Sequence, residues 1–201
     1  MRAWRDRGTL GLALLASVIA LWPSTTSARA PAANQCVTPA GDDLNQTFAT
    51  DDAFIAPFCR TARVGDHWRP IVRIAMAGSD PVFPSGFTPS APDLLEDFFA
   101  KFVSARYVVD AGTKRERSFT FTADQLIFET GALPDGSVFV RWMPRLRPLP
   151  KGEHTVTEYL TLRADFWDGL GTDPQLNLIP AGESLVDQLA FTVVTPSRSG
   201  R

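Results

Sequence analysis

Histidine and cysteine are scarce in this chain, and charge of either sign is not in marked excess. Only 2 of 201 residues are histidine and 2 are cysteine. His67 and His154 lie far apart in the sequence, so a zinc site would need other ligands. The 20 lysines and arginines are balanced by 22 acidic residues, which argues against a nucleic-acid binder, since such proteins neutralise phosphates with clustered basic side chains.

The chain also lacks a hydrophobic run long enough to span a bilayer, which takes about 20 residues. Its longest run, Leu10–Trp22, follows three arginines and precedes small and polar residues. This pattern predicts a secretory signal peptide over residues 1–30. Cleavage after Ala30 or Ala32 fits the small-residue rule, so the mature chain should begin between Pro31 and Asn34. We expect a soluble secreted or periplasmic protein, with no membrane insertion after the signal is removed.

The two cysteines are expected to pair, because thiols in an oxidising compartment form disulfides unless they have another role. A Cys36–Cys59 disulfide would close a loop of about 24 residues. The chain-entropy model gives such a bond roughly 3 kcal/mol of stabilisation.

The mature chain divides into two regions that differ in composition and in hydrophobic pattern, within one domain. Residues 31–92 are rich in Pro, Asp, Ala and Gly and are predicted to be an irregular, disulfide-tied segment with one strand at Ile71–Met76. Residues 93–196 should form a helix and a β-sandwich, followed by a disordered tail at 197–201. The helix is expected over Ala91–Lys101 with Ser90 as its N-cap, because apolar residues recur there at three- to four-residue spacing.

Six further runs after the helix alternate apolar and polar residues and are separated by turn signals, which is typical of a sandwich or barrel. They are Val103–Val109, Ser118–Thr122, Leu126–Phe128, Val138–Met143, Thr155–Leu162 and Leu185–Val193. Because no helices alternate with these strands, a parallel sheet is disfavoured. We predict a mainly β protein, an antiparallel immunoglobulin-like sandwich of about seven strands with one short helix.

A rigid corner is expected between the strands around Trp142 and Val156. Pro148, Pro150 and Gly152 restrict this connection, and His154 stands where immunoglobulin-like sandwiches often carry a tyrosine that hydrogen-bonds to the corner backbone. We expect His154 to make such a bond through a ring nitrogen.

The segment Pro148–Val156 resembles a loose group of uncharacterised bacterial exported proteins with a Pro-Leu-Pro-x-Gly-x-His-Thr-Val corner. Asp135-Gly136 and the early Cys36 also match that group, and the similarity covers about a third of the mature chain. The resemblance implies a β-sandwich fold. It implies no substrate, because a shared sandwich does not carry a function.

The loop from Asp165 to Asp173 is the sharpest candidate for a metal site. Asp165, Asp168 and Asp173 surround two glycines, and Ca²⁺ takes six to eight oxygen ligands from flexible loops. The spacing differs from that of an EF-hand. The favoured interpretation is that the aspartates and glycines form turns and that the protein has no cofactor, with calcium binding as the alternative.

Tryptophans provide the candidate ligand-binding residues, because an aromatic ring can stack on a sugar while carboxylates accept its hydroxyl groups. Trp68 and Trp167 lie near predicted loops and are the candidates for contact with a glycan. Trp142 lies within a strand and is expected in the core.

We assign no catalytic residue from the sequence, which has no Gly-x-Ser-x-Gly elbow. The favoured interpretation is an exported, non-enzymatic binding or interaction module for an unknown protein or glycan, and its oligomeric state is left open. The alternative is a hydrolase of cell-envelope glycan that uses carboxylates of the Asp165–Asp173 loop, which would require two carboxyl groups about 5 to 10 Å apart.

Overall fold

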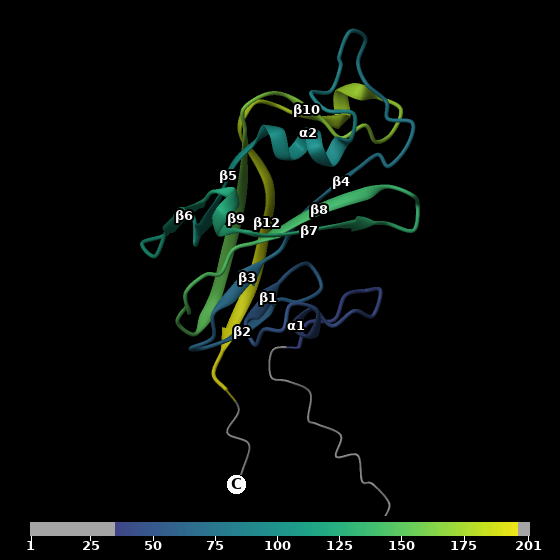
Figure 1. The fold of residues 1–201 in the computed structure, drawn as a ribbon. Helices are drawn as coiled ribbons and strands as arrows, with labels where there is room; N and C mark the ends of the chain where they lie inside the picture. Colours follow the sequence, from purple (N-terminus) through teal and green to yellow (C-terminus); the bar gives the residue numbers. More distant parts are fainter. Residues whose placement is uncertain (1–34, 197–201) are drawn as a thin grey trace, which may run out of the picture. The chain divides into compact units, whose positions relative to one another are not determined.

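The longest strands of the protein form one five-stranded sheet, in a computed structural model that describes residues 35–196. In this sheet β9 (Gly152–Leu162) pairs antiparallel with β12 (Gly182–Val194) on one side and with β5 (Phe102–Val109) on the other. β6 (Arg117–Phe121) pairs with the far side of β5, and the short β2 (Thr61–Arg63) runs parallel to β12. The strand order is therefore β2-β12-β9-β5-β6 (Figure 1).

The remaining strands form a three-stranded sheet and two short pairs. The three-stranded sheet is antiparallel, with the order β4-β8-β7, and consists of β4 (Val72–Met76), β8 (Val138–Met143) and β7 (Ile127–Ala132). The short pairs are the parallel β1 (Ala53–Ile55) and β3 (Trp68–Pro70) and the antiparallel β10 (Phe166–Trp167) and β11 (Leu178–Ile179). The helices are α1 (Leu44–Thr47), α2 (Leu94–Lys101) and two 3-10 turns, η1 (Ala123–Gln125) and η2 (Pro174–Asn177).

The two larger sheets share a hydrophobic core, because their strands turn alternate side chains toward it. Val140 and Trp142 of β8 belong to the same buried cluster as Val156 and Leu160 of β9. Trp142 is 1% exposed, so its predicted place in the core is confirmed. The mainly β fold is confirmed as well, and its sheets are consistent with a sandwich. The immunoglobulin-like strand order is not confirmed.

The predicted helix forms, but it begins at Leu94 instead of Ala91. Its N-cap is Asp93, whose carboxylate accepts hydrogen bonds from the second and third helical N–H groups. Ser90 was the wrong choice of cap: its backbone N–H donates to Oδ1 of Asp97 at 2.6 Å. Both residue types cap helices well, and the one directly before the first helical residue takes the role.

The region up to residue 92 is more regular than predicted. It contains the four strands β1 to β4, of which only β4 matches the expected strand, so the prediction of a single strand was wrong. β1, β2 and β3 have three residues each, too few to show a period-two alternation.

The predicted disulfide is present. Cys36 and Cys59 are joined with their Cα atoms 5.8 Å apart, and they pack in a second buried cluster with Leu44, Phe54 and Met143. Because Met143 lies on β8, this cluster attaches the disulfide-tied segment to the three-stranded sheet.

One carboxyl group points into the core from β9. Glu158 lies opposite Tyr107 of β5 and is 1% exposed. Among residues 35–196, neither of its carboxyl oxygens has a hydrogen-bond partner. Burial raises the pKa of Glu158 well above its usual range, and the nearby carboxylate of Asp187 adds to the rise. The fold thus favours the neutral, protonated acid.

The predicted signal peptide at residues 1–30, the cleavage region up to Asn34 and the predicted tail at 197–201 lie outside the described residues. None of the helices in the described part of the chain has the length and apolarity needed to cross a bilayer.

Candidate functional site

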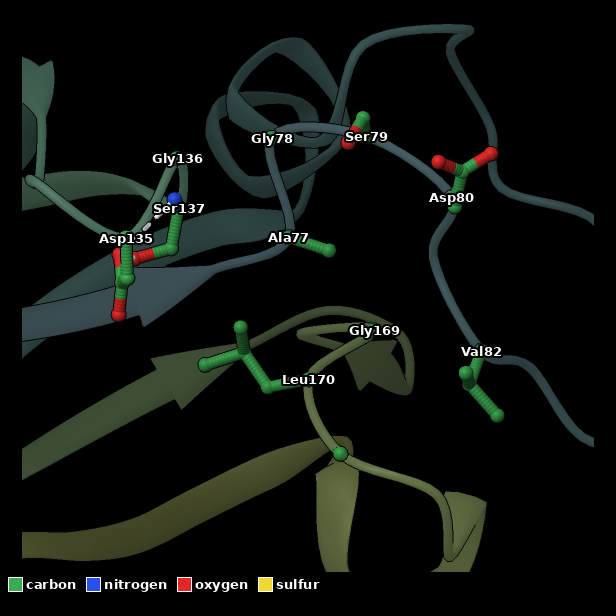
Figure 2. Close-up of a pocket in the computed structure, with 11 residues that line it drawn as sticks. Ala77, Gly78, Ser79, Asp80, Val82, Asp135, Gly136, Ser137, Gly169 and Leu170 are labelled. Carbon is green, nitrogen blue, oxygen red and sulfur yellow. Dashed lines mark hydrogen bonds between the residues drawn. The ribbon is translucent and has the colours of Figure 1, made fainter.

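A cavity of about 250 Å³ lies where three loops meet. One loop follows β4, the second is the turn between β7 and β8, and the third follows β10 (Figure 2). Ligand pockets for drug-sized molecules usually have volumes of about 300 to 1,000 Å³, so this cavity suits a small chemical group. Its lining residues are Ala77, Gly78, Ser79, Asp80, Val82, Asp135, Gly136, Ser137, Gly169, Leu170 and Gly171.

Backbone hydrogen bonds join two of these loops. The N–H of Ala77 donates to the carbonyl oxygen of Asp168 at 2.7 Å, and the N–H of Val82 donates to that of Gly169 at 3.0 Å. The segments after β4 and after β10 are therefore paired by backbone atoms, which gives the cavity two connected walls.

Glycines allow the walls to approach each other closely. A Cβ atom on Gly78 would overlap the carbonyl oxygen of Gly136, and one on Gly169 would lie 2.6 Å from Cβ of Pro81. Gly169 also has a φ of +71°, which residues with a side chain rarely adopt. Bulkier residues at Gly78 and Gly169 would therefore push the loops apart.

Asp135 is the best-defined polar group of the cavity. Its Oδ1 accepts hydrogen bonds from the hydroxyl of Ser137 at 2.6 Å and from the N–H of Ser137 at 3.0 Å. These bonds, the hydroxyl bond first, lower the pKa of Asp135 below its usual range. The exposed Asp135 is consequently a stable anion at neutral pH.

The lining chemistry is anionic and polar. Asp80 and Asp135 come from different loops, as Figure 2 shows, and Ser79 and Ser137 add hydroxyl groups. Among the lining residues there is no lysine, arginine, histidine or aromatic side chain. The arrangement can accept hydrogen bonds and attract positive charge. It offers no ring on which a sugar could stack.

Two of the three aspartates predicted to bind calcium accept hydrogen bonds from backbone amides. Oδ1 of Asp165 accepts the N–H of Ala181 and Oδ1 of Asp168 accepts the N–H of Leu170, both at 2.8 Å. No group of three or more His, Cys, Asp or Glu side chains that could hold a metal ion, with Asp173 or without it, occurs in the described residues. Partial burial raises the pKa of Asp168. The loop contributes to the cavity through Gly169, Leu170 and Gly171, and its carboxylates are absent from the lining.

Trp68, predicted as a ligand-binding residue, is part of the core. It is 1% exposed, its ring lies 4.9 Å from that of Phe191, and its indole N–H donates to the carbonyl oxygen of Arg147 at 2.9 Å. The prediction was wrong because β3, which contains Trp68, is held by a parallel pairing with β1 that the local sequence does not reveal.

Trp167 lies beside the site without lining it. Its ring is half-buried and packs 4.2 Å from the ring of Phe87. Its indole nitrogen is buried and has no hydrogen-bond partner among the described residues. Trp167 therefore helps to hold the loop before α2 in place, and its ring does not form an open platform.

His154 makes the corner hydrogen bond that its position suggests. Its Nε2 lies 2.9 Å from the carbonyl oxygen of Pro150, and its Nδ1 lies 2.9 Å from Oδ2 of Asp110. The partner Asp110 was not singled out from the sequence, because it lies 44 residues away and only the pairing of β5 with β9 brings it near.

Comparisons with known proteins add no family or activity. The chain matches no protein-family model, no curated protein and no solved structure.

Proposed function

We propose that the chain is an exported, non-enzymatic binding module whose loop cavity holds a protonated primary amine of its partner. The observation that carries this proposal is the composition of the lining, which includes two aspartates on different loops, two serines and no basic residue. An ammonium group donates three hydrogen bonds and carries the complementary charge.

Such an amine can come from a lysine of a partner protein or from an amino sugar of a glycan. The absence of an aromatic platform in the lining favours recognition of the charged group itself. The cavity volume of about 250 Å³ fits the end of a side chain or part of one sugar ring.

Calorimetric titration tests the proposal with three probes. They are a glucosamine oligosaccharide, its N-acetylated counterpart and a lysine amide acetylated at the α-nitrogen, whose side-chain amine is free. We expect at least one free-amine probe to bind and the acetylated glycan to bind at least about tenfold more weakly, since hydrogen bonds to charged groups contribute about 1.5 to 3 kcal/mol. A stronger signal with the glycan or with the lysine probe identifies the source of the amine.

Asp135→Asn is the matched variant, because asparagine still accepts the two bonds from Ser137 while the charge is removed. It should weaken the binding of amines about tenfold, whereas Asp124→Asn, at an exposed position outside the lining, should not. Equal binding of free and acetylated probes, or binding that is insensitive to Asp135→Asn, would contradict the proposal.

A glycan hydrolase is the second candidate, because the pKa values of Asp135 and Asp168 move in opposite directions. Such a separation is typical of general acid and base pairs. The carboxyl of Asp168 is absent from the lining, however, and one of its oxygens is bonded to Leu170. New reducing ends released from the glucosamine oligosaccharide during the titration would favour this alternative.

A further inference from the structure

His154 is a buried ring held between two oxygen acceptors. It is 2% exposed on the core face of β9. Its Nε2 lies 2.9 Å from the carbonyl oxygen of Pro150, and its Nδ1 lies 2.9 Å from Oδ2 of Asp110. Both nitrogens are therefore engaged by groups that ordinarily accept hydrogen bonds.

The chemistry of these partners determines the number of protons on the ring. A carbonyl oxygen can only accept, so Nε2 must carry a hydrogen. Oδ1 of Asp110 accepts the N–H of Thr155 at 3.2 Å, and the guanidinium of Arg115 lies 3.4 Å from Oδ2. Both neighbours favour the ionised carboxylate. Nδ1 must then donate too, and a histidine that donates from both nitrogens is an imidazolium.

The hydrogen bonds of His154 connect three parts of the fold. Asp110 directly follows β5 and has a φ of +53°, and Pro150 lies in the corner between β8 and β9. In the same corner, the carbonyl oxygen of Arg147 accepts a hydrogen bond from the indole N–H of Trp68. The backbone N–H of Trp68 donates to Leu146 next to it. A change in the hydrogen bonds of His154 would therefore also affect the corner residues to which Trp68 of β3 is bonded.

We infer that the His154–Asp110 pair is a pH-sensitive lock that holds the corner at residues 147–152 to the turn at residues 110–116. Loss of one proton from the pair leaves the lone pair of Nδ1 facing the Asp110 carboxylate. The bond to Oδ2 then becomes repulsive, and the corner loosens as the pH rises.

The groups that face this pair come from each neighbouring element. They are Arg115 in the turn after β5, the Pro150 carbonyl in the corner and, on β12, the uncharged ring of Phe191, whose centroid lies 5.8 Å from that of His154. The next titratable side chain on the core face of β9 is Glu158, which faces Tyr107 and Asp187.

Nitrogen NMR of the full chain tests the lock directly. The protein has only two histidines, so His67 supplies an internal reference. We expect both ring nitrogens of His154 to show protonated-nitrogen shifts at pH 7, and Nδ1 to lose its proton at higher pH. A neutral ring with one bare nitrogen at pH 7 would overturn the inference, whatever the behaviour of any variant.

Asp110→Asn is the matched variant, since asparagine tolerates a positive φ. Its amide can accept from Thr155 and donate to a bare Nδ1, so the corner stays bonded to a neutral ring. As Nδ1 of the wild type loses its proton, hydrogen exchange at the Thr155 amide should rise about tenfold or more relative to the variant. The same pH dependence in both proteins would also overturn the inference.

Discussion

The core face of β9 and the loop cavity both contain carboxyl groups, but the two surroundings shift the pKa of these groups in opposite directions. In the cavity, Asp135 is exposed and its pKa is lowered by hydrogen bonds from Ser137. On β9, Glu158 is buried without a hydrogen-bond partner among residues 35–196, and its pKa is raised well above the usual range.

The difference shows that the surroundings of a carboxyl group, and not its residue type, decide what it can do. The cavity keeps a negative charge available to a positively charged ligand. The core favours the protonated form of Glu158, which makes the stability of the fold depend on pH. Changes to the two carboxyl groups should therefore have separable effects: substitution of Glu158 affects stability, and substitution of Asp135 affects binding.

The largest effect is expected in the core. Trp68→Ala removes a buried ring and its bond to Arg147, so it should reduce the free energy of unfolding by about 3 to 5 kcal/mol. Trp167→Ala, at a half-buried ring beside the cavity, serves as the comparison and should cost less. Urea denaturation measures both. A Trp167 variant that is less stable than the Trp68 variant would contradict the assignment of these two rings.

The next largest effect depends on pH and concerns Glu158. Because its pKa is raised on folding, the folded state holds the proton more tightly than the unfolded chain, whose carboxyl titrates near pH 4.3. This contribution to stability is fully present below the unfolded pKa and is lost as the pH rises through the folded pKa, with a slope of up to about 1.4 kcal/mol per pH unit.

Glu158→Gln should remove that slope, because glutamine does not titrate. We expect the variant to gain stability relative to the wild type between about pH 5 and pH 8, when unfolding is measured by urea at each pH. Glu96→Gln, at an exposed helical position, is the control and should leave the slope unchanged. If the free energies of unfolding of the wild type and of Glu158→Gln depended on pH in the same way, the pKa of Glu158 would not be raised on folding.

The smallest effect on stability is expected at the cavity wall. Gly78→Ala places a methyl group against the backbone of Gly136, and the required shift should cost about 1 to 3 kcal/mol. It should also abolish binding of the amine probes by displacing the turn that holds Asp135. Ser79→Ala, at the next position, should change stability by no more than about 0.5 kcal/mol. Unaltered binding by Gly78→Ala would place the ligand outside this cavity.

Prediction from the sequence succeeded where the signal is local. The seven expected strands all correspond to observed strands, because alternation of apolar and polar residues directly reports a half-buried strand. The same alternation continues through β9 to Glu158, so its burial could have been inferred from Val156 and Leu160 on either side. The Asp135-Gly136 turn and the glycines after Asp168 were visible as turns, but their meeting in one cavity was not.

Apart from the N-cap of α2, the errors concern contacts between distant segments. The three-residue strands β1, β2 and β3 exist only through partners elsewhere in the chain, and Trp68 is buried for that reason. The calcium hypothesis for the Asp165–Asp173 loop stays a prediction. In the described structure, Asp165 and Asp168 each accept a hydrogen bond from a backbone amide.

By itself, the sequence was sufficient to establish a mainly β chain and the positions of its main strands, since periodicity and turn chemistry act over a few residues. It also indicated the disulfide, because only two cysteines are present to pair. The loop cavity, the contact between His154 and Asp110 and the burial of Glu158 were decided by tertiary structure. Each depends on groups tens of residues apart that meet only when the chain folds, and the pKa values of Asp135 and Glu158 are shifted by the hydrogen bonding and burial found there.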